Sequence, residues 1–268
     1  MATDLDTQST GNTAPAAGPG APGAAAAILE MDQVVAGYGK MMVLKGTSFK
    51  VARGAITTII GPNGAGKSTV FKAVFGLIGV QSGRILFDGR EITGWNQRRL
   101  LEAGICYVPQ GRNIFPELTV RHNLELGGIA AGAGINLGQR IDALMQRFPM
   151  LRVKAGSQAS TLSGGQQKLL EIARGLLLDP KLMLIDEPSI GLSPLLVQET
   201  FAILSELRAK GVTVLMVEQN ARSALKLSDY GIVLEVGETR IEDTAASILA
   251  DPRIGQLFLG GALAAREA

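Results

Sequence analysis

Residues 61–69 read Gly-Pro-Asn-Gly-Ala-Gly-Lys-Ser-Thr and match the pattern G-x-x-x-x-G-K-[ST]. An apolar, β-branched run at residues 55–60 precedes this stretch, and a helical pattern over residues 67–77 follows it. A glycine-rich loop between a strand and a helix can point its N–H groups at an anion, and the helix N-terminus adds roughly half a positive charge. We therefore predict a phosphate-binding loop. The alternative, a glycine-rich turn that fits by chance, does not account for the flanking strand and helix.

The side chains of this loop suit a nucleoside triphosphate. Lys67 brings a mobile ammonium to the β- and γ-phosphates, where we also expect it to act in catalysis, and the Ser68 hydroxyl can ligate Mg²⁺. Each charge-assisted hydrogen bond contributes roughly 1.5–3 kcal/mol, so several together can hold a triphosphate. The predicted nucleotide-binding residues are Gly61, Pro62, Asn63, Gly64, Ala65, Gly66, Lys67, Ser68 and Thr69.

Two carboxylates end an apolar strand later in the chain, at Leu182-Met-Leu-Ile-Asp-Glu187. Because successive side chains of a strand point to opposite faces, we expect Asp186 and Glu187 to have different roles. We expect Asp186 to hold Mg²⁺ through water, and Glu187 to face the attacking water as general base or positioner. Acids at a strand end are more often a solvated helix cap, but a glycine loop first and an acidic strand second is the order of P-loop NTPases.

Apolar runs of about the length of a buried strand recur along the chain. They lie at residues 55–60, 105–108, 182–185, 212–217 and 230–234. Helical patterns follow residue 165 and cover residues 67–77, 194–209 and 221–227. Strands that alternate with helices predict an α/β fold, with a largely parallel sheet flanked by helices.

Other segments differ from this core. The early segments 29–35, 47–51 and 84–87 predict an antiparallel sheet, with turns at residues 53–54 and 88–89. Weak strand content and helical patterns predict a helical lobe over residues from about 112 to 175. The first segment, residues 1–27, is rich in Ala, Gly and Pro and has too few large apolar side chains to offset its ordering entropy. We predict a disordered tail there, a folded body over residues 28–262 and a second tail over residues 263–268.

Composition excludes several classes of protein. No run of about 18 or more apolar residues exists that could cross a bilayer as a helix. A single cysteine, Cys106, excludes a disulfide-stapled secreted domain. Lys and Arg total 26 against 24 Asp and Glu, and the resulting net charge of +2 gives no reason to propose a nucleic-acid partner.

The stretch Thr161-Leu-Ser-Gly-Gly-Gln-Gln167 distinguishes among P-loop families, because it resembles the signature sequence of ATP-binding cassette (ABC) ATPases. It opens an amphipathic helix whose N-terminus can bind a second anion, although Ser163 also suits an ordinary N-cap. In that family the motif binds the γ-phosphate of ATP held by the opposite subunit. The resemblance therefore implies ATP and Mg²⁺ as cofactors and a head-to-tail dimer. It assigns ATP binding to Ser163, Gly164, Gly165 and Gln166.

Other positions are similar to the family one by one. Tyr38 looks like the aromatic residue that stacks on adenine, although a lone tyrosine is as often part of a core. Gln110 looks like the glutamine that contacts Mg²⁺ and links the site to the helical lobe. Residues 191–194 occupy the position of the family's D-loop. The resemblance covers residues from about 28 to 260.

Two positions depart from the family pattern. Gln219 stands where the family usually has a switch histidine; its amide can donate a hydrogen bond to a γ-phosphate but carries no charge. The resemblance thus implies a catalytic position for Gln219 with an altered role. Ser193 replaces the D-loop aspartate, which weakens any inference about communication across the dimer. The only histidine, His122, falls in the predicted helical lobe, and we interpret it as a structural or surface residue.

Short strings at residues 107–112, 115–120, 187–194 and 217–220 resemble the ATPases of branched-chain amino acid importers, a subgroup with close relatives for amides and urea. This resemblance implies a homodimer or a heterodimer with another ABC ATPase, two membrane permeases, a solute-binding protein and no nucleic acid. It implies a peripheral location on the cytoplasmic face of the inner membrane. The alternatives are an exporter ATPase and a soluble ABC ATPase that acts on nucleic acid or ribosomes. Arg112, Phe115 and Pro116 are candidates for the permease-coupling surface, although a solvated loop is an equal interpretation.

Overall fold

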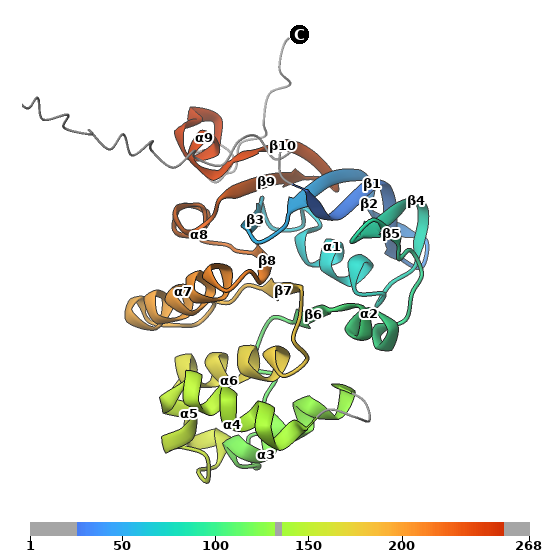
Figure 1. Ribbon diagram of the computed structural model, residues 1–268. Coiled ribbons are helices and arrows are strands. Elements are labelled where there is room, and N and C mark those ends of the chain that lie inside the picture. Colours follow the sequence, from blue (N-terminus) through green and yellow to red (C-terminus); the bar gives the residue numbers. More distant parts are fainter. Residues whose placement is uncertain (1–25, 132–135, 255–268) are drawn as a thin grey trace, which may run out of the picture.

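A six-stranded sheet forms the centre of the described chain, in the order β10-β9-β3-β8-β7-β6. β3, β6, β7, β8 and β9 pair in parallel, and β10 runs antiparallel to β9 at the edge. This sheet and its flanking helices confirm the predicted α/β class (Figure 1). The strands are β3 (Ile56–Ile60), β6 (Ile105–Val108), β7 (Leu182–Asp186), β8 (Thr213–Val217), β9 (Tyr230–Glu235) and β10 (Glu238–Thr244).

The computed structural model describes residues 26–131 and 136–254. The predicted tail at residues 1–25, the predicted end of the body at residue 262 and the tail at 263–268 lie outside these residues. The first strand, β1 (Ala27–Tyr38), already begins inside the segment that we predicted as a tail. The reason is backbone pairing, because Ala27 pairs with Ala52 and the Ala26 carbonyl accepts a hydrogen bond from the Arg53 N–H.

Both faces of the central sheet are buried. In β7, Leu182 and Leu184 pack on one face and Met183 and Ile185 on the other, as alternation along a strand requires. The first face packs on α1 (Lys67–Val74). The second packs on α6 (Gly164–Leu176), α7 (Pro194–Ala209) and α8 (Ala221–Leu227), as Figure 1 shows for α7 and α8.

A second, antiparallel sheet covers α1 from the outside, in the order β2-β1-β4-β5. Its other strands are β2 (Met41–Ala52), β4 (Val80–Phe87) and β5 (Arg90–Glu91). The predicted sheet is confirmed, with longer strands than expected because β1 pairs with both β2 and β4. Turns lie at both predicted positions. The turn at residues 88–89 joins β4 to β5, whereas residues 53–54 lead from β2 into the central sheet.

A helical lobe is inserted between β6 and β7, and Figure 1 shows it beyond that edge of the sheet. Its helices enclose an apolar cluster of their own, which includes Leu124, Ile141, Leu151 and Leu170. The lobe comprises α3 (Val120–Gly127), η1 (Gly128–Ala131), α4 (Leu137–Arg147), α5 (Pro149–Val153), η2 (Ala159–Thr161) and α6. Within the ranges that the structure describes, no helix is both long and apolar enough to cross a membrane.

Four short elements outside the helical lobe were not predicted: β5, α2 (Gln97–Ala103), β10 and α9 (Ala245–Ala250). In α2 a single side chain, Leu100, is buried, so the segment has no apolar periodicity to detect. The helix instead begins at Asn96, whose side chain accepts a hydrogen bond from the Arg99 N–H. β10 is largely polar and half-buried, because it pairs on one side only.

The helical lobe depends on its own apolar cluster, which a matched pair of substitutions in α3 can test. Leu124 is fully buried, while Leu126 of the same helix is 37% exposed. We expect Leu124→Ala to lower the free energy of unfolding by about 2–5 kcal/mol, and Leu126→Ala to lower it by less than about 1 kcal/mol. Urea titrations followed by circular dichroism measure both. Equal losses for the two variants would contradict the described packing.

Candidate active site

The functional residues gather at one edge of the central sheet, where its parallel strands end. β8 lies between β3 and β7, so the loops after these three strands leave the sheet side by side. They carry the glycine loop after Ile60, the Asp186-Glu187 pair and the Glu218-Gln219 pair. The carboxyl edge of a parallel sheet is where α/β proteins bind ligands.

The glycine loop wraps the start of α1 as its sequence predicts. Gly64 and Gly66 have φ angles of +81° and +102°, in the left-handed region that favours glycine. At Gly61 a Cβ would lie 2.1 Å from the carbonyl oxygen of Leu234 in β9, so no larger residue fits. No side chain caps α1, which begins after Gly66, and the helix start faces the loop with its backbone N–H groups.

Lys67 is folded back into this loop and is only 7% exposed. Its Nζ donates hydrogen bonds to the carbonyl oxygens of Gly61 (2.8 Å) and Pro62 (3.0 Å). Burial lowers the pKa of Lys67, while the nearby carboxylates of Glu187 and Asp186 raise it. The ammonium therefore stands between the loop and the two acids.

Asp186 ends β7 with its side chain 2% exposed. Its Oδ1 accepts a hydrogen bond from the Ser68 hydroxyl and its Oδ2 one from the Tyr107 hydroxyl, each at 3.3 Å. Burial raises the pKa of Asp186, an effect that these two hydrogen bonds and the charges of Lys72 and Lys67 oppose. A buried carboxylate beside a hydroxyl is a pair of hard oxygen donors, the kind that Mg²⁺ prefers.

Glu187 has a different set of partners, as expected for the next residue along. Its φ is +47°, an unusual value for a residue with a side chain, and its N–H donates to the Val217 carbonyl of β8 (2.9 Å). Its Oε2 accepts a hydrogen bond from Gln110 Nε2 (2.8 Å). Burial raises the pKa of the Glu187 carboxyl, and the neighbouring Asp186 and Glu218 raise it further, against Lys67.

The loop that follows Gln110 is held by a buried ion pair in α6 that we had not predicted. Lys168 and Glu171 lie 2.5 Å apart, with side chains 6% and 3% exposed. Lys168 Nζ donates to the Gly111 carbonyl (3.2 Å), and Glu171 Oε1 accepts from the Asn113 N–H (2.6 Å). The helix that begins at the signature stretch thereby fixes the segment from which Gln110 reaches Glu187.

Glu218 is a second positioning residue that we had not predicted. It is 1% exposed and accepts hydrogen bonds from the N–H groups of Ser189 (2.8 Å) and Gln219 (3.1 Å). It therefore joins the loop after β7 to the loop after β8. An acid that directly follows a buried strand is the signal that could have revealed it.

The signature stretch starts α6 at the surface. Ser163 and Gln166 form a capping box: the Ser163 hydroxyl accepts from the Gln166 N–H (3.3 Å), and Gln166 Oε1 accepts from the Ser163 N–H (3.1 Å). Ser163 is exposed and Gly164 half-buried, while Gly165 is buried where a Cβ would lie 2.6 Å from Leu196 Cδ2. Ser163 thus serves as an N-cap while remaining accessible.

Four further residues that we noted in the sequence lie apart from the phosphate loop's contacts. Tyr38, at the end of β1, is 41% exposed, with the Lys72 ammonium 5.4 Å from its ring centroid. Gln219 is exposed after β8, and His122 is exposed on α3. Ser193 precedes α7 but makes no side-chain capping bond.

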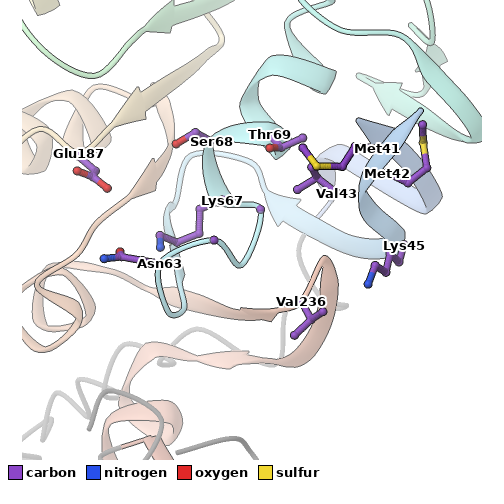
Figure 2. A pocket seen from close by; sticks show the side chains of 12 residues that line it. Met41, Met42, Val43, Lys45, Asn63, Lys67, Ser68, Thr69, Glu187 and Val236 are labelled. Atoms are coloured by element: carbon purple, nitrogen blue, oxygen red, sulfur yellow. The ribbon is translucent and has the colours of Figure 1, made fainter. Parts of the chain in front are cut away.

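A cleft of about 500 Å³ opens over the loop and has two chemically different ends (Figure 2). Lys67, Asn63 and Glu187 lie at one end, and Val43, Met41 and Val236 at the other, which is mainly apolar and also carries Lys45. The full lining comprises Met41, Met42, Val43, Lys45, Asn63, Gly64, Gly66, Lys67, Ser68, Thr69, Glu187 and Val236. A charged end beside an apolar end suits a molecule that is part anion and part aromatic base.

Comparison with known proteins agrees with the family resemblance noted in the sequence. The family model described as "ABC transporter" matches residues 44–190, more than half of the chain. The chain is 42% identical over 234 residues to the high-affinity branched-chain amino acid transport ATP-binding protein BraG of Pseudomonas aeruginosa, covering 87% of this chain and all of BraG. It is 32% identical to the lipopolysaccharide export system ATP-binding protein LptB of Escherichia coli, covering 87% of this chain and 98% of LptB.

A solved structure is also similar to this chain over most of the chain's length. It is an ATP-binding cassette of an ABC transporter in its ADP conformation, with a TM-score of 0.79 and 31% identity. The match covers 88% of this chain and 100% of the other.

Because the Asp186 carboxylate is buried, we predict that the free energy of unfolding depends on pH. Because its folded-state pKa is raised, the folded chain binds more protons than the unfolded chain between the ordinary pKa and the raised one. Asp186→Asn should therefore raise the melting midpoint of the nucleotide-free chain at neutral pH, by roughly 2–4 °C per kcal/mol regained. This gain should fade as the pH falls through the raised pKa toward the ordinary value.

Scanning calorimetry at several pH values checks this expectation. Asp142→Asn is the control, since the Asp142 side chain on α4 is 63% exposed and its charge costs little to hold. A drop in melting midpoint for Asp186→Asn at neutral pH would show that the hydrogen bonds to the carboxylate outweigh its desolvation.

Proposed function

Because the chain belongs to the ABC transporter family and is an ATPase, we propose that it powers an importer for branched-chain amino acids. The observation that carries this proposal is the end-to-end match to BraG, at a higher identity than the match to the lipopolysaccharide exporter subunit. The short strings that resemble this importer subgroup agree with this assignment.

ATP binding is assigned to the glycine loop and the cleft above it. The phosphates lie against the N–H groups at the start of α1 and against Lys67, which can turn from Gly61 and Pro62 to the ligand. Mg²⁺ fits the donors present, the Ser68 hydroxyl and the Asp186 carboxylate. The side chain of Gln110, the third predicted ligand, donates a hydrogen bond to Glu187. When bound, Mg²⁺ would neutralise part of the negative charge of the phosphates. The described residues hold no cluster of three acidic, Cys or His side chains, and Mg²⁺ needs none when phosphates and waters complete its shell.

Hydrolysis is assigned to Glu187. Its raised pKa makes it a stronger proton acceptor than an ordinary glutamate, and the Gln110 hydrogen bond orients it for the attacking water. Gln219 lies on the adjacent loop, tied through Glu218 to the loop after β7. We assign to its amide a hydrogen bond to the γ-phosphate, a contact that carries no proton.

The accessible signature stretch supports a head-to-tail dimer. Ser163 is exposed at the N-terminus of α6, where the capping box comes from Ser163 and Gln166 themselves. A second copy, or a different ABC ATPase, can therefore present its bound ATP to residues 163–166. Closure of this dimer would move the helical lobes, and removal of the γ-phosphate would release them.

The permease-coupling surface is assigned to Arg112, Phe115 and Pro116. All three are exposed, and the Arg174 guanidinium lies 5.1 Å from the Phe115 ring centroid. The Asn113 N–H of this segment donates a hydrogen bond to Glu171 of α6. A displacement of the segment would therefore be transmitted to the signature helix and to Gln110. In the complex we expect two permeases, a solute-binding protein and a peripheral position on the cytoplasmic face of the inner membrane.

The assignment of Glu187 can be tested with an isosteric change. Glu187→Gln should slow ATP turnover by about 10²–10⁴-fold, because the amide cannot accept the proton of water. Its affinity for MgATP should stay within about threefold of wild type. Steady-state phosphate release and titration calorimetry measure the two quantities, with Glu125→Gln in α3 as control, because the Glu125 side chain is 44% exposed. Turnover near the wild-type rate would exclude Glu187 as the water's partner.

The transported solute can be tested in the native cell. Deletion of this chain should abolish uptake of radiolabelled leucine, isoleucine and valine, and expression of the wild type should restore it. Lys67→Ala, which removes the ammonium from the phosphate loop, should not. If urea or amide uptake is lost while leucine uptake is unchanged, the assignment to branched-chain amino acids is wrong.

A further inference from the structure

The turn between β9 and β10 holds a residue that its geometry does not favour. Val236 and Gly237 form a two-residue hairpin turn with φ angles of +50° and +81°. Turns with positive φ at both central positions favour Asn-Gly or Asp-Gly. A β-branched residue in the left-handed region is strained, and strain that persists points to a function.

A second hairpin turn of the chain gives an internal comparison. Asp88 and Gly89, between β4 and β5, have φ angles of +52° and +74°. This turn carries the Asp-Gly pair that the geometry favours, and neither residue lines the cleft. Among described residues other than glycine with positive φ, Val236 is the one with a β-branched side chain. The unfavourable choice is thus confined to the turn beside the active site.

Hydrogen bonds hold this turn in place. The Gly237 N–H donates to the Ala65 carbonyl of the phosphate loop (2.9 Å), and the Gly237 carbonyl accepts from the Lys45 N–H (2.9 Å) and the Thr47 hydroxyl (2.6 Å). A Cβ at Gly237 would lie 1.9 Å from the Val43 carbonyl oxygen, so the turn packs closely on β2. Val236 therefore cannot relax outward and stays fixed relative to the phosphate loop.

The Val236 side chain has no core packing to offset its strain. It is 57% exposed, and it lines the cleft at the apolar end, with Val43 and Met41 of β2 (Figure 2). The charged end of the same cleft, at Lys67, is where the phosphates belong. The part of a ligand that extends from its phosphates along the cleft would therefore contact this end.

We propose that Val236 is a further nucleotide-binding residue, whose methyl groups contact the nucleoside part of the bound triphosphate opposite Val43 and Met41. This inference rests on the proposed ATP binding at the phosphate loop and adds a contact for the base and ribose. The backbone strain is retained because a valine at this position supplies apolar surface that asparagine or glycine lacks. The residue therefore lowers the stability of the empty chain and raises its affinity for the nucleoside.

The test separates the nucleoside from the phosphates. Val236→Asn places the favoured residue in the turn, and Val236→Gly relieves the strain by another route. For each, we expect a higher melting midpoint without nucleotide and MgATP binding weakened by about three- to tenfold, the effect of exposing part of one aliphatic contact. Binding of inorganic tripolyphosphate with Mg²⁺, which has no nucleoside, should equal that of wild type. Asp88→Asn in the other turn is the control and should leave MgATP affinity unchanged.

Each contrary result is distinct. Unchanged MgATP affinity in both folded Val236 variants would overturn the contact. An equal loss for MgATP and tripolyphosphate would also overturn it, because the effect would then pass through the phosphate loop. If wild type binds MgATP but not tripolyphosphate, and Lys67→Ala binds MgATP normally, the phosphate-loop assignment falls and the contact with it.

Discussion

The parallel pairing of β3, β8 and β7 is the constraint on which the site depends. Because these strands run in the same direction and in neighbouring positions, the glycine loop, the acidic pair and Glu218 all emerge at one edge. The buried apolar faces of the sheet then fix this edge, since a one-residue slip of β7 would exchange the faces of its side chains. Asp186 meets Ser68, and Glu187 meets Gln110, only because that register is held.

The helical lobe is attached to this edge by polar contacts as well as by chain connections. Glu171 and Lys168 of α6 hold the backbone that follows Gln110, and Gln110 in turn contacts Glu187. A buried ion pair of this kind is weak evidence for stability, but its geometry is specific. The start of α6 and the carboxylate at the sheet edge are therefore linked within one subunit by two residues of one helix turn.

The sequence allowed the position of a candidate site residue to be predicted wherever a motif had a fixed spacing. The glycine loop, Asp186 and Glu187 could be placed because strand, loop and helix follow one another without a gap. Glu218 and the Lys168–Glu171 pair could not, since their partners are backbone N–H and carbonyl groups far away in sequence, and any acid or lysine can make such bonds. The apolar end of the cleft escaped prediction because it joins β2 to the β9–β10 turn, segments about 190 residues apart. Short polar elements such as α2 and β10 lack the apolar repeat that reveals longer ones.

The position of Lys67 makes ligand binding an exchange. Its ammonium donates hydrogen bonds to two carbonyl oxygens of its own loop. Under the proposed function, a phosphate that binds Lys67 replaces these two hydrogen bonds, so the affinity reports the difference between two sets of hydrogen bonds. These two hydrogen bonds also mean that the Lys67 ammonium beside Asp186 and Glu187 has hydrogen-bond partners. Backbone carbonyl oxygens of the loop thus occupy the Lys67 ammonium until an anion replaces them.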